Sequence, residues 1–232
     1  MRINLSCNEL KALLIRTFEA LYGHTRDYHD MAHTVLWLEC CGHDGVASLV
    51  EALPYLEQEG LAKPSLIKKQ DDHFIMDCEG HSLFCLASSI CDLTTALLSE
   101  TKAAACVGVI NTQNSQALMG VLRMAARQGF AAMTMYEGYA ARIEAGADYP
   151  IINQNQNISG LSFMCARRAT TLDEYTKNFG RIIVDENIQT QAYMASLNDG
   201  INIARSDYDA LKTVANRVLV EATEASRKGA GE

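Results

Sequence analysis

The sequence predicts an α/β fold in which an N-terminal helical subdomain packs on a mixed β-sheet core. Apolar residues at helical spacing fill the first 60 positions, whereas short apolar strand patterns alternate with helical ones from residue 65 onwards. The length of 232 residues suits one large domain or two small ones, and 48% hydrophobic residues are ordinary for a globular chain. We therefore expect a helical subdomain over 1–60, an α/β core over 61–221 and a flexible tail over 222–232.

Three helices are expected in the N-terminal subdomain. The first runs over 7–22 and begins at a capping box formed by Ser6 and Glu9. A second apolar stripe carries helix to about Cys41, and a third helical pattern spans 46–59.

The remaining chain alternates strands and helices. The order strand, helix, strand over 105–135 indicates a crossover unit within a sheet. The stretch 136–157 has no clear periodicity. The expected strands are 65–67, 73–77, 105–110, 129–135, 158–165 and 181–184, and the expected helices are 82–99, 115–128 and a final one that opens at 206.

Charge and composition restrict the partners. A net charge of -8 argues against nucleic acid and against an anionic membrane, since both attract basic patches. No stretch reaches the roughly 18 apolar residues of a spanning helix, and no signal-peptide pattern opens the chain, so we expect a cytoplasmic protein without a membrane partner. The eight cysteines are then expected to be reduced thiols.

The best candidate for chemistry is the turn Cys-Cys-Gly-His-Asp-Gly-Val at 40–46. His43 titrates near neutrality and Asp44 could orient it, which is the pairing that general acid–base catalysis uses. An ordinary surface pair is the alternative, because adjacent side chains in a turn often point apart.

A candidate ligand site follows the predicted strand 105–110. Asn111, Asn114 and Ser115 lie where α/β folds commonly place ligands, and their amides and hydroxyls suit a small carboxylic acid. Capping of the next helix by Asn114 or Ser115 explains the same residues. Arg167 and Arg168 could bind an acidic ligand by bidentate contacts, or form a solvated pair.

Zinc is a further alternative, because two Cys-x-x-His pairs could supply four soft ligands: Cys40, His43, Cys78 and His81. Such pairs also arise by chance in a chain with eight cysteines. His29 and His33 have the spacing of a zinc-protease helix, but Asp30 replaces the glutamate that acts as general base. For these histidines we favour a partly exposed helix face.

Four segments, read in order, resemble the malate/L-lactate dehydrogenases, which are NAD(P)-dependent enzymes without a Rossmann domain. They are the helical N-terminus, the turn Gly42–Val46, the segment Asp77–Gly80 and the strand end Ile110–Asn114. The likeness covers residues 5–145. It implies a malate/L-lactate dehydrogenase-like fold, NAD or NADP as cofactor, a small 2-oxo or 2-hydroxy acid as substrate, and a homodimer.

The chain departs from that family at both of its histidine segments. When Gly45 is placed on the family's Gly-Val pair, Asp44 stands at the first histidine and His43 one residue before it. At the second segment Asn114 takes the place of the histidine. Two functions therefore stay open: an oxidoreductase in which His43 or Asp44 donates the proton, and a catalytically inactive dehydrogenase-like binding or accessory subunit.

A second resemblance is to an uncharacterised bacterial family of about this length. The matching segments are Ser6–Leu10, Trp37–Leu38, Gly45–Val46 and Ala222–Gly231. This likeness supplies no function, but it makes the C-terminal tail a genuine feature that could dock on a partner protein.

Overall fold

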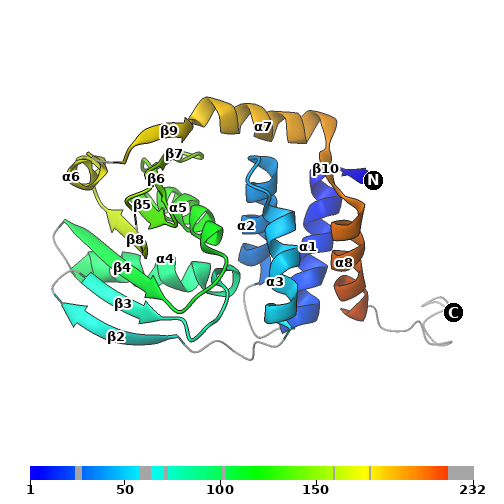
Figure 1. The fold of residues 1–232 in the computed structure, drawn as a ribbon, viewed down its shortest axis with the longest axis horizontal. Helices are drawn as coiled ribbons and strands as arrows, with labels where there is room; N and C mark the ends of the chain where they lie inside the picture. The colour runs from blue at the N-terminus through cyan, green and yellow to red at the C-terminus, as the bar shows by residue number, and fades with distance from the viewer. Residues whose placement is uncertain are drawn as a thin grey trace, which may run out of the picture.

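The computed structural model describes residues 1–23, 28–57, 64–70, 73–100, 103–158, 160–177 and 179–218. The predicted tail over 222–232 lies outside the described residues. The described chain forms a layer of upright helices beside a sheet with helices of its own (Figure 1).

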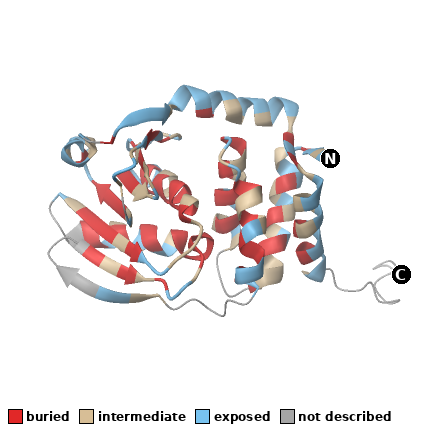
Figure 2. Ribbon diagram, in the orientation of Figure 1, coloured by how far each residue is buried: buried red, intermediate tan, exposed pale blue. Residues whose placement is uncertain are grey.

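Four helices stand side by side in the helical layer (Figure 1): α1 (Cys7–Tyr22), α2 (Tyr28–Cys40), α3 (Gly45–Leu56) and α8 (Arg205–Ala215). The predicted capping box is confirmed, because the Ser6 hydroxyl accepts from the Glu9 backbone N–H and the Glu9 carboxylate accepts from the Ser6 N–H. Figure 2 shows that these helices bury the faces that they turn toward one another.

The C-terminal elements return to the N-terminal helices. Strand β1 (Arg2–Leu5) pairs antiparallel with β10 (Ile201–Ala204), and α8 packs against α1 and α3. The division of the chain near residue 60 remains a proposal from the sequence. In the structure, the last described elements pack against the first ones.

In the described residues the larger sheet has eight strands and is mixed, as predicted. Strands β3 and β4 are parallel and the other neighbours are antiparallel, with β8 between β4 and β5. The predicted crossover therefore joins two strands that are parallel but not adjacent. In spatial order the strands are β2 (Ser65–Gln70), β3 (His73–Asp77), β4 (Ala104–Ile110), β8 (Leu161–Ala166), β5 (Ala131–Tyr136), β6 (Tyr139–Ile143), β7 (Ile151–Gln154) and β9 (Arg181–Val184).

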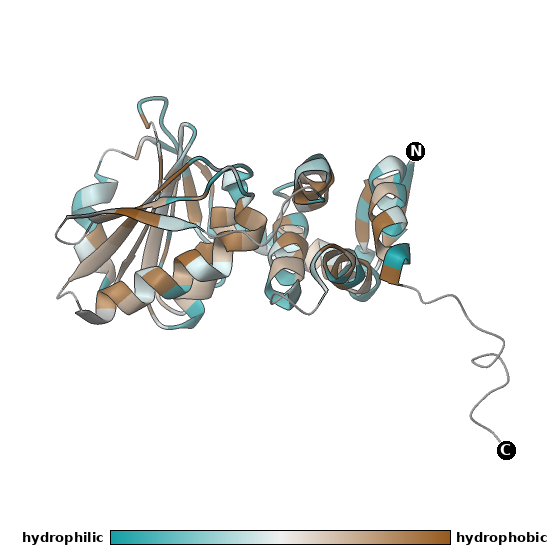
Figure 3. Cartoon of the chain, turned by 90° about the horizontal axis from the view of Figure 1, so that it is seen from below, coloured by the Kyte–Doolittle hydropathy of each residue, from teal (hydrophilic) through white to brown (hydrophobic). Residues whose placement is uncertain are grey.

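Helices α4 (Leu83–Glu100) and α5 (Leu118–Arg127) lie together on one face of the sheet (Figure 3). Alternate residues of β4 point to opposite faces, so Val107 enters the main core while Cys106 enters a smaller cluster with Leu172 and Phe179. Two short elements, η2 (Ala169–Leu172) and α6 (Asp173–Thr176), lie between β8 and β9. A 3-10 turn, η1 (Ser115–Ala117), precedes α5, so the regular helix begins later than the sequence predicted.

Helix α7 (Glu186–Asp199) is absent from the sequence prediction. It begins where the Asp185 side chain accepts from the Ile188 N–H, and it ends at Gly200. Only Gln189 of this helix is buried, so an apolar stripe could not identify it. In Figure 1 it runs along the top from β9 to β10. Among the described helices, none is long and apolar enough to cross a membrane.

Candidate functional site

The Gly-Val pair of the 40–46 turn has a structural explanation. At Gly45, the first residue of α3, a Cβ atom would lie 2.4 Å from the carbonyl oxygen of Val35 in α2. The next residue, Val46, donates its backbone N–H to the Glu39 carboxylate at 2.8 Å, which satisfies one of the open donors at the start of α3. Close helix packing therefore requires glycine here, whether or not the turn carries chemistry.

The His43 imidazole is hydrogen-bonded to another side chain of the protein. Its Nε2 lies 3.1 Å from Oε1 of Gln189, a fully buried residue of α7. The Gln189 amide nitrogen donates to the carbonyls of Pro150 and Asp185, which turns its oxygen toward His43 and makes Nε2 the donor. Burial lowers the pKa of His43, so the ring is neutral at pH 7. Asp44 is exposed, in the left-handed region at φ 48°, and makes no capping bond to α3.

The low pKa of His43 has a consequence for stability. The ordinary pKa of a histidine is 6.5, and the pKa of His43 in the folded chain is lower. As pH drops below 6.5, the unfolded chain binds a proton on this ring more readily than the folded chain does. The free energy of unfolding should therefore fall as pH drops. His43→Gln should make that decline shallower, and urea unfolding at several pH values between 5 and 8 would measure it. A variant with the same pH slope as the parent would contradict the assignment.

The loops that follow β3 and β4 lie at the same edge of the sheet, as their parallel pairing requires. The Asn111 amide donates to both carboxylate oxygens of Asp77, at 3.1 and 3.0 Å. The Asn114 amide oxygen accepts from the Ser82 hydroxyl at 2.7 Å, and the Asn114 side chain makes no capping bond to the turn after it. Ser115 is buried. The sequence-predicted amides are thus together, and they hold the two loops to each other.

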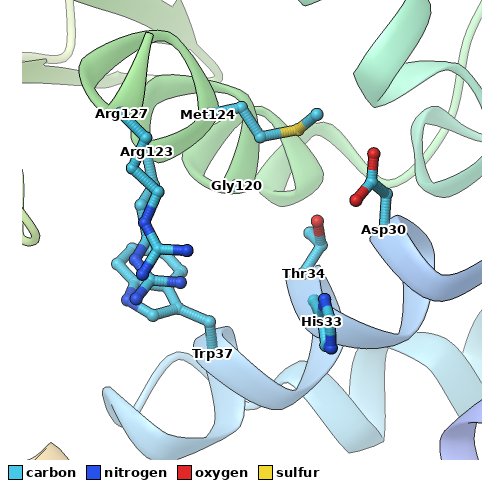
Figure 4. Close-up of a pocket in the computed structure, with 8 residues that line it drawn as sticks. All are labelled: Asp30, His33, Thr34, Trp37, Gly120, Arg123, Met124 and Arg127. Carbon is cyan, nitrogen blue, oxygen red and sulfur yellow. The ribbon is translucent and has the colours of Figure 1, made fainter. Parts of the chain in front are cut away.

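The two predicted halves of the site do not converge. Helices α2 and α5 run parallel, with Thr34 beside Gly120 and Trp37 beside Arg123 (Figure 4). The start of α5, which follows Asn114, is therefore at the beginning of α2, whereas the turn with His43 and Asp44 follows the end of α2. A helix of 13 residues separates these ends by about 20 Å.

The two predicted arginines lie elsewhere. Arg167 and Arg168 are exposed and follow β8, which runs antiparallel to β4 with Ala166 opposite Ala104. They are therefore at the far end of β4 from Asn111, about 20 Å away along the strand.

The four predicted zinc ligands are also not brought together. The Cys40 thiol lies 3.9 Å from that of Cys7, and His43 faces Gln189. Burial raises the pKa of Cys78 to about 11, which keeps its thiol protonated. Within the described ranges, no three His, Cys, Asp or Glu side chains are grouped to hold a metal ion. The second histidine pair, His29 and His33, lies on the exposed side of α2, as we favoured.

A pocket that the sequence did not reveal lies between α2 and α5 (Figure 4). Each helix supplies four residues at positions i, i+3, i+4 and i+7, which is one helical face. The volume is about 80 Å³. The lining residues are Asp30, His33, Thr34, Trp37, Gly120, Arg123, Met124 and Arg127.

Two buried donors on residues that line this pocket have no acceptor among the described residues. Trp37 is 3% exposed, and within the described part of the chain neither its Nε1 nor the Nε of Arg123 has a hydrogen-bond partner. The Arg123 guanidinium lies over the indole, 5.6 Å from the ring centroid. Leaving a buried donor without an acceptor costs about 1–3 kcal/mol, so two of them in one pocket call for an explanation.

A second pocket, of about 310 Å³, surrounds Arg142 on the sheet. The Arg142 guanidinium already bonds the carboxylates of Glu144 at 2.9 Å and Asp173 at 2.7 Å, and Glu186 adds a further acid to the lining. This pocket is therefore a poor match for the pyrophosphate of a nicotinamide dinucleotide, and the α2/α5 pocket is too small for one. The residues of these two pockets do not fit NAD or NADP.

The N-terminal third of the chain is similar to a family without an assigned function. Residues 5–81 match a family described as protein of unknown function (DUF3726). No curated protein matches the chain. The expected resemblance to an uncharacterised family is confirmed.

Solved structures of dehydrogenases and reductases share the fold. Malate dehydrogenase from Pyrococcus horikoshii OT3 superposes with a TM-score of 0.67 at 13% identity, over 95% of this chain and 97% of that one. Sulfolactate dehydrogenase from Methanocaldococcus jannaschii gives 0.67 at 10% identity, over 92% and 97%. Delta1-piperideine-2-carboxylate reductase from Pseudomonas syringae pvar. tomato gives 0.58 at 13% identity, over 91% and 99%. The predicted malate/L-lactate dehydrogenase-like fold is therefore confirmed.

Proposed function

We propose that this chain is a dehydrogenase-like protein that binds a small carboxylic acid and does not transfer hydride. The observation that carries the proposal is the separation of the candidate groups: His43 and Asp44 follow one end of α2, and Asn111 and Asn114 lie near the other. The similarity in fold to dehydrogenases of small acids supports the ligand class.

The chemistry of the two ends agrees with a binding role. A general acid must come within hydrogen-bond reach of the atom that it protonates. His43 directs its Nε2 proton to Gln189, about 20 Å by helix length from the Asn114 loop. At the other end, the Asn111 amide nitrogen donates to Asp77 and the Asn114 amide oxygen accepts from Ser82. An acid held at that loop would have no proton donor at the 40–46 turn.

The alternative function is an NAD(P)-dependent oxidoreductase that acts on a small 2-oxo or 2-hydroxy acid. The fold shared with malate dehydrogenase and sulfolactate dehydrogenase favours it. Under this alternative His43 or Asp44 would be the proton donor, so replacing the imidazole should lower turnover by about 10²–10⁴.

The two functions are separated by titrating the purified full chain with NADH and NADPH, followed by nucleotide fluorescence and calorimetry. Consumption of reduced nucleotide is then measured with a panel of 2-oxo acids. We expect no saturable nucleotide binding and no consumption above that without protein. Turnover that is present in the parent chain and lost in His43→Gln would overturn the binding role and establish the oxidoreductase.

A further inference from the structure

We infer that the pocket between α2 and α5 is a binding site for a short-chain monocarboxylate, held by the indole N–H of Trp37 and the guanidinium of Arg123. This inference deepens the proposed function and rests on it only for the expectation of an acid ligand. The site is distinct from the 40–46 turn and from the Asn111–Ser115 segment.

The hydrogen-bonding character of the pocket selects an acceptor. Indole and guanidinium nitrogens donate only, and the Nε1 of Trp37 and the Nε of Arg123 both lack an acceptor in the described structure. A carboxylate has two acceptor oxygens and can take both bonds, with the shorter, stronger geometry of a charge-assisted pair on the arginine. Both nitrogens are closed to solvent where the guanidinium lies over the indole, so an acceptor in the pocket reaches them when the Arg123 side chain shifts on the ring.

The charge at the Trp37 end of the pocket favours an anion. At the Trp37 end of the pocket, Arg123 and Arg127 share one carboxylate, that of Asp148, at 3.6 and 3.7 Å, which leaves one positive charge in excess at this end, whereas Asp30 supplies a negative charge at the other end. Burial keeps the nearby Cys41 thiol neutral by raising its pKa to about 12, and it lowers the pKa of His33, so neither changes this balance at pH 7. A single carboxylate neutralises the Trp37 end of the pocket.

The far end of the pocket disfavours a second carboxylate. Asp30 lies two helical turns before Trp37 on the same face of α2, about 10 Å away along the helix axis. The carboxylate of Asp30 would repel the distal group of a dicarboxylic acid. A volume of about 80 Å³ is also well below that of sites for larger organic ligands.

The wall between these ends is narrow and partly apolar. Gly120 has no side chain and approaches Thr34 closely, since a Cβ at Gly120 would lie 2.4 Å from the Thr34 methyl group. The Met124 side chain extends from α5 beside them and adds a thioether to the lining (Figure 4). The ligand chemistry is therefore one carboxylate on a small, partly apolar body, as in lactate or pyruvate.

Trp37 provides a direct probe, because it is the only tryptophan in the sequence. A 15N-labelled full chain has one indole N–H signal, and a new acceptor at Nε1 should shift it. We expect lactate or pyruvate to shift this signal saturably at constant ionic strength. Arg123→Gln should weaken binding at least tenfold, and Arg123→Lys, which keeps the charge but loses the Nε–H, should weaken it by less.

Arg205→Gln is the matched control, because Arg205 also pairs with a carboxylate and lies over an aromatic ring, Tyr208, but outside the pocket. It should bind as the parent does. Unchanged backbone signals and thermal unfolding would show that the Arg123 variants are folded, and calorimetry on Trp37→Phe should show the same loss of affinity.

Three outcomes would overturn the site: no shift of the indole signal with any acid, equal shifts with phosphate and chloride, which indicate an adventitious ion only, or unchanged affinity in Arg123→Gln. If no acid binds in this pocket and no reduced nucleotide is consumed, the site is overturned but the proposed binding role is not. Turnover with NADH would remove that role, and the Arg123 variants would then show whether the pocket holds the substrate.

Discussion

Gly45→Ala should destabilise the fold by about 3 kcal/mol or more, because its methyl group would overlap backbone that cannot move aside. The added Cβ would lie 2.4 Å from the carbonyl oxygen of Val35, 2.8 Å from the Cβ of Leu38 and 2.9 Å from the amide nitrogen of Glu39. Relief requires α3 to move away from α2, and that movement would break the bond from Val46 to the Glu39 carboxylate. Urea unfolding of the purified variant measures the loss.

Gly108→Ala is the control for that change. A Cβ at Gly108 in β4 would meet its nearest atoms at 3.6 and 3.7 Å, which is ordinary van der Waals contact. Since glycine weakens a strand interior by about 0.5–1 kcal/mol relative to alanine, this variant should be neutral or slightly more stable than the parent. If Gly45→Ala were tolerated equally well, helix packing would not explain the Gly-Val pair.

Gln189→Ala should cost about 2–4 kcal/mol, although it removes no apolar contact of a conventional core. The Gln189 amide joins three segments: the turn through His43, the carbonyl of Pro150 before β7, and the first turn of α7 through Asp185. Truncation removes the Gln189 bonds to Nε2 of the half-buried His43 and to the Pro150 carbonyl.

Gln191→Ala, an exposed change in the same helix, should alter the free energy of unfolding by no more than about 0.5 kcal/mol. The comparison separates the buried hydrogen bonds from helix propensity, because both variants replace glutamine by alanine in α7. Equal stabilities of the two variants would mean that the Gln189 amide does not secure the turn.

The elements that the sequence could predict are those with a local cause. The capping box at Ser6 and Glu9 and the apolar stripe after it define α1 from local chemistry alone, and the buried run of β4 is equally direct. Helix α7 has one buried residue and therefore no apolar stripe. The only sequence signals for it are the capping residue Asp185 at its start and Gly200 at its end.

The candidate site depended on topology that one sequence does not contain. The sequence could place Asn111 at the end of a strand, but not the pairing of its amide with Asp77. Arg167 falls at the opposite end of the sheet because β8 is antiparallel to β4. Trp37 and Arg123 are 86 residues apart, and their meeting follows from the parallel packing of α2 on α5.

Calorimetric titration of the full chain with lactate or pyruvate, with and without NADH, tests whether this dehydrogenase-like scaffold binds a small acid without the reaction. Saturable binding that is the same in both titrations, with no loss of NADH, is the predicted result. Binding that appears only after NADH is added, together with consumption of the nucleotide, would contradict it.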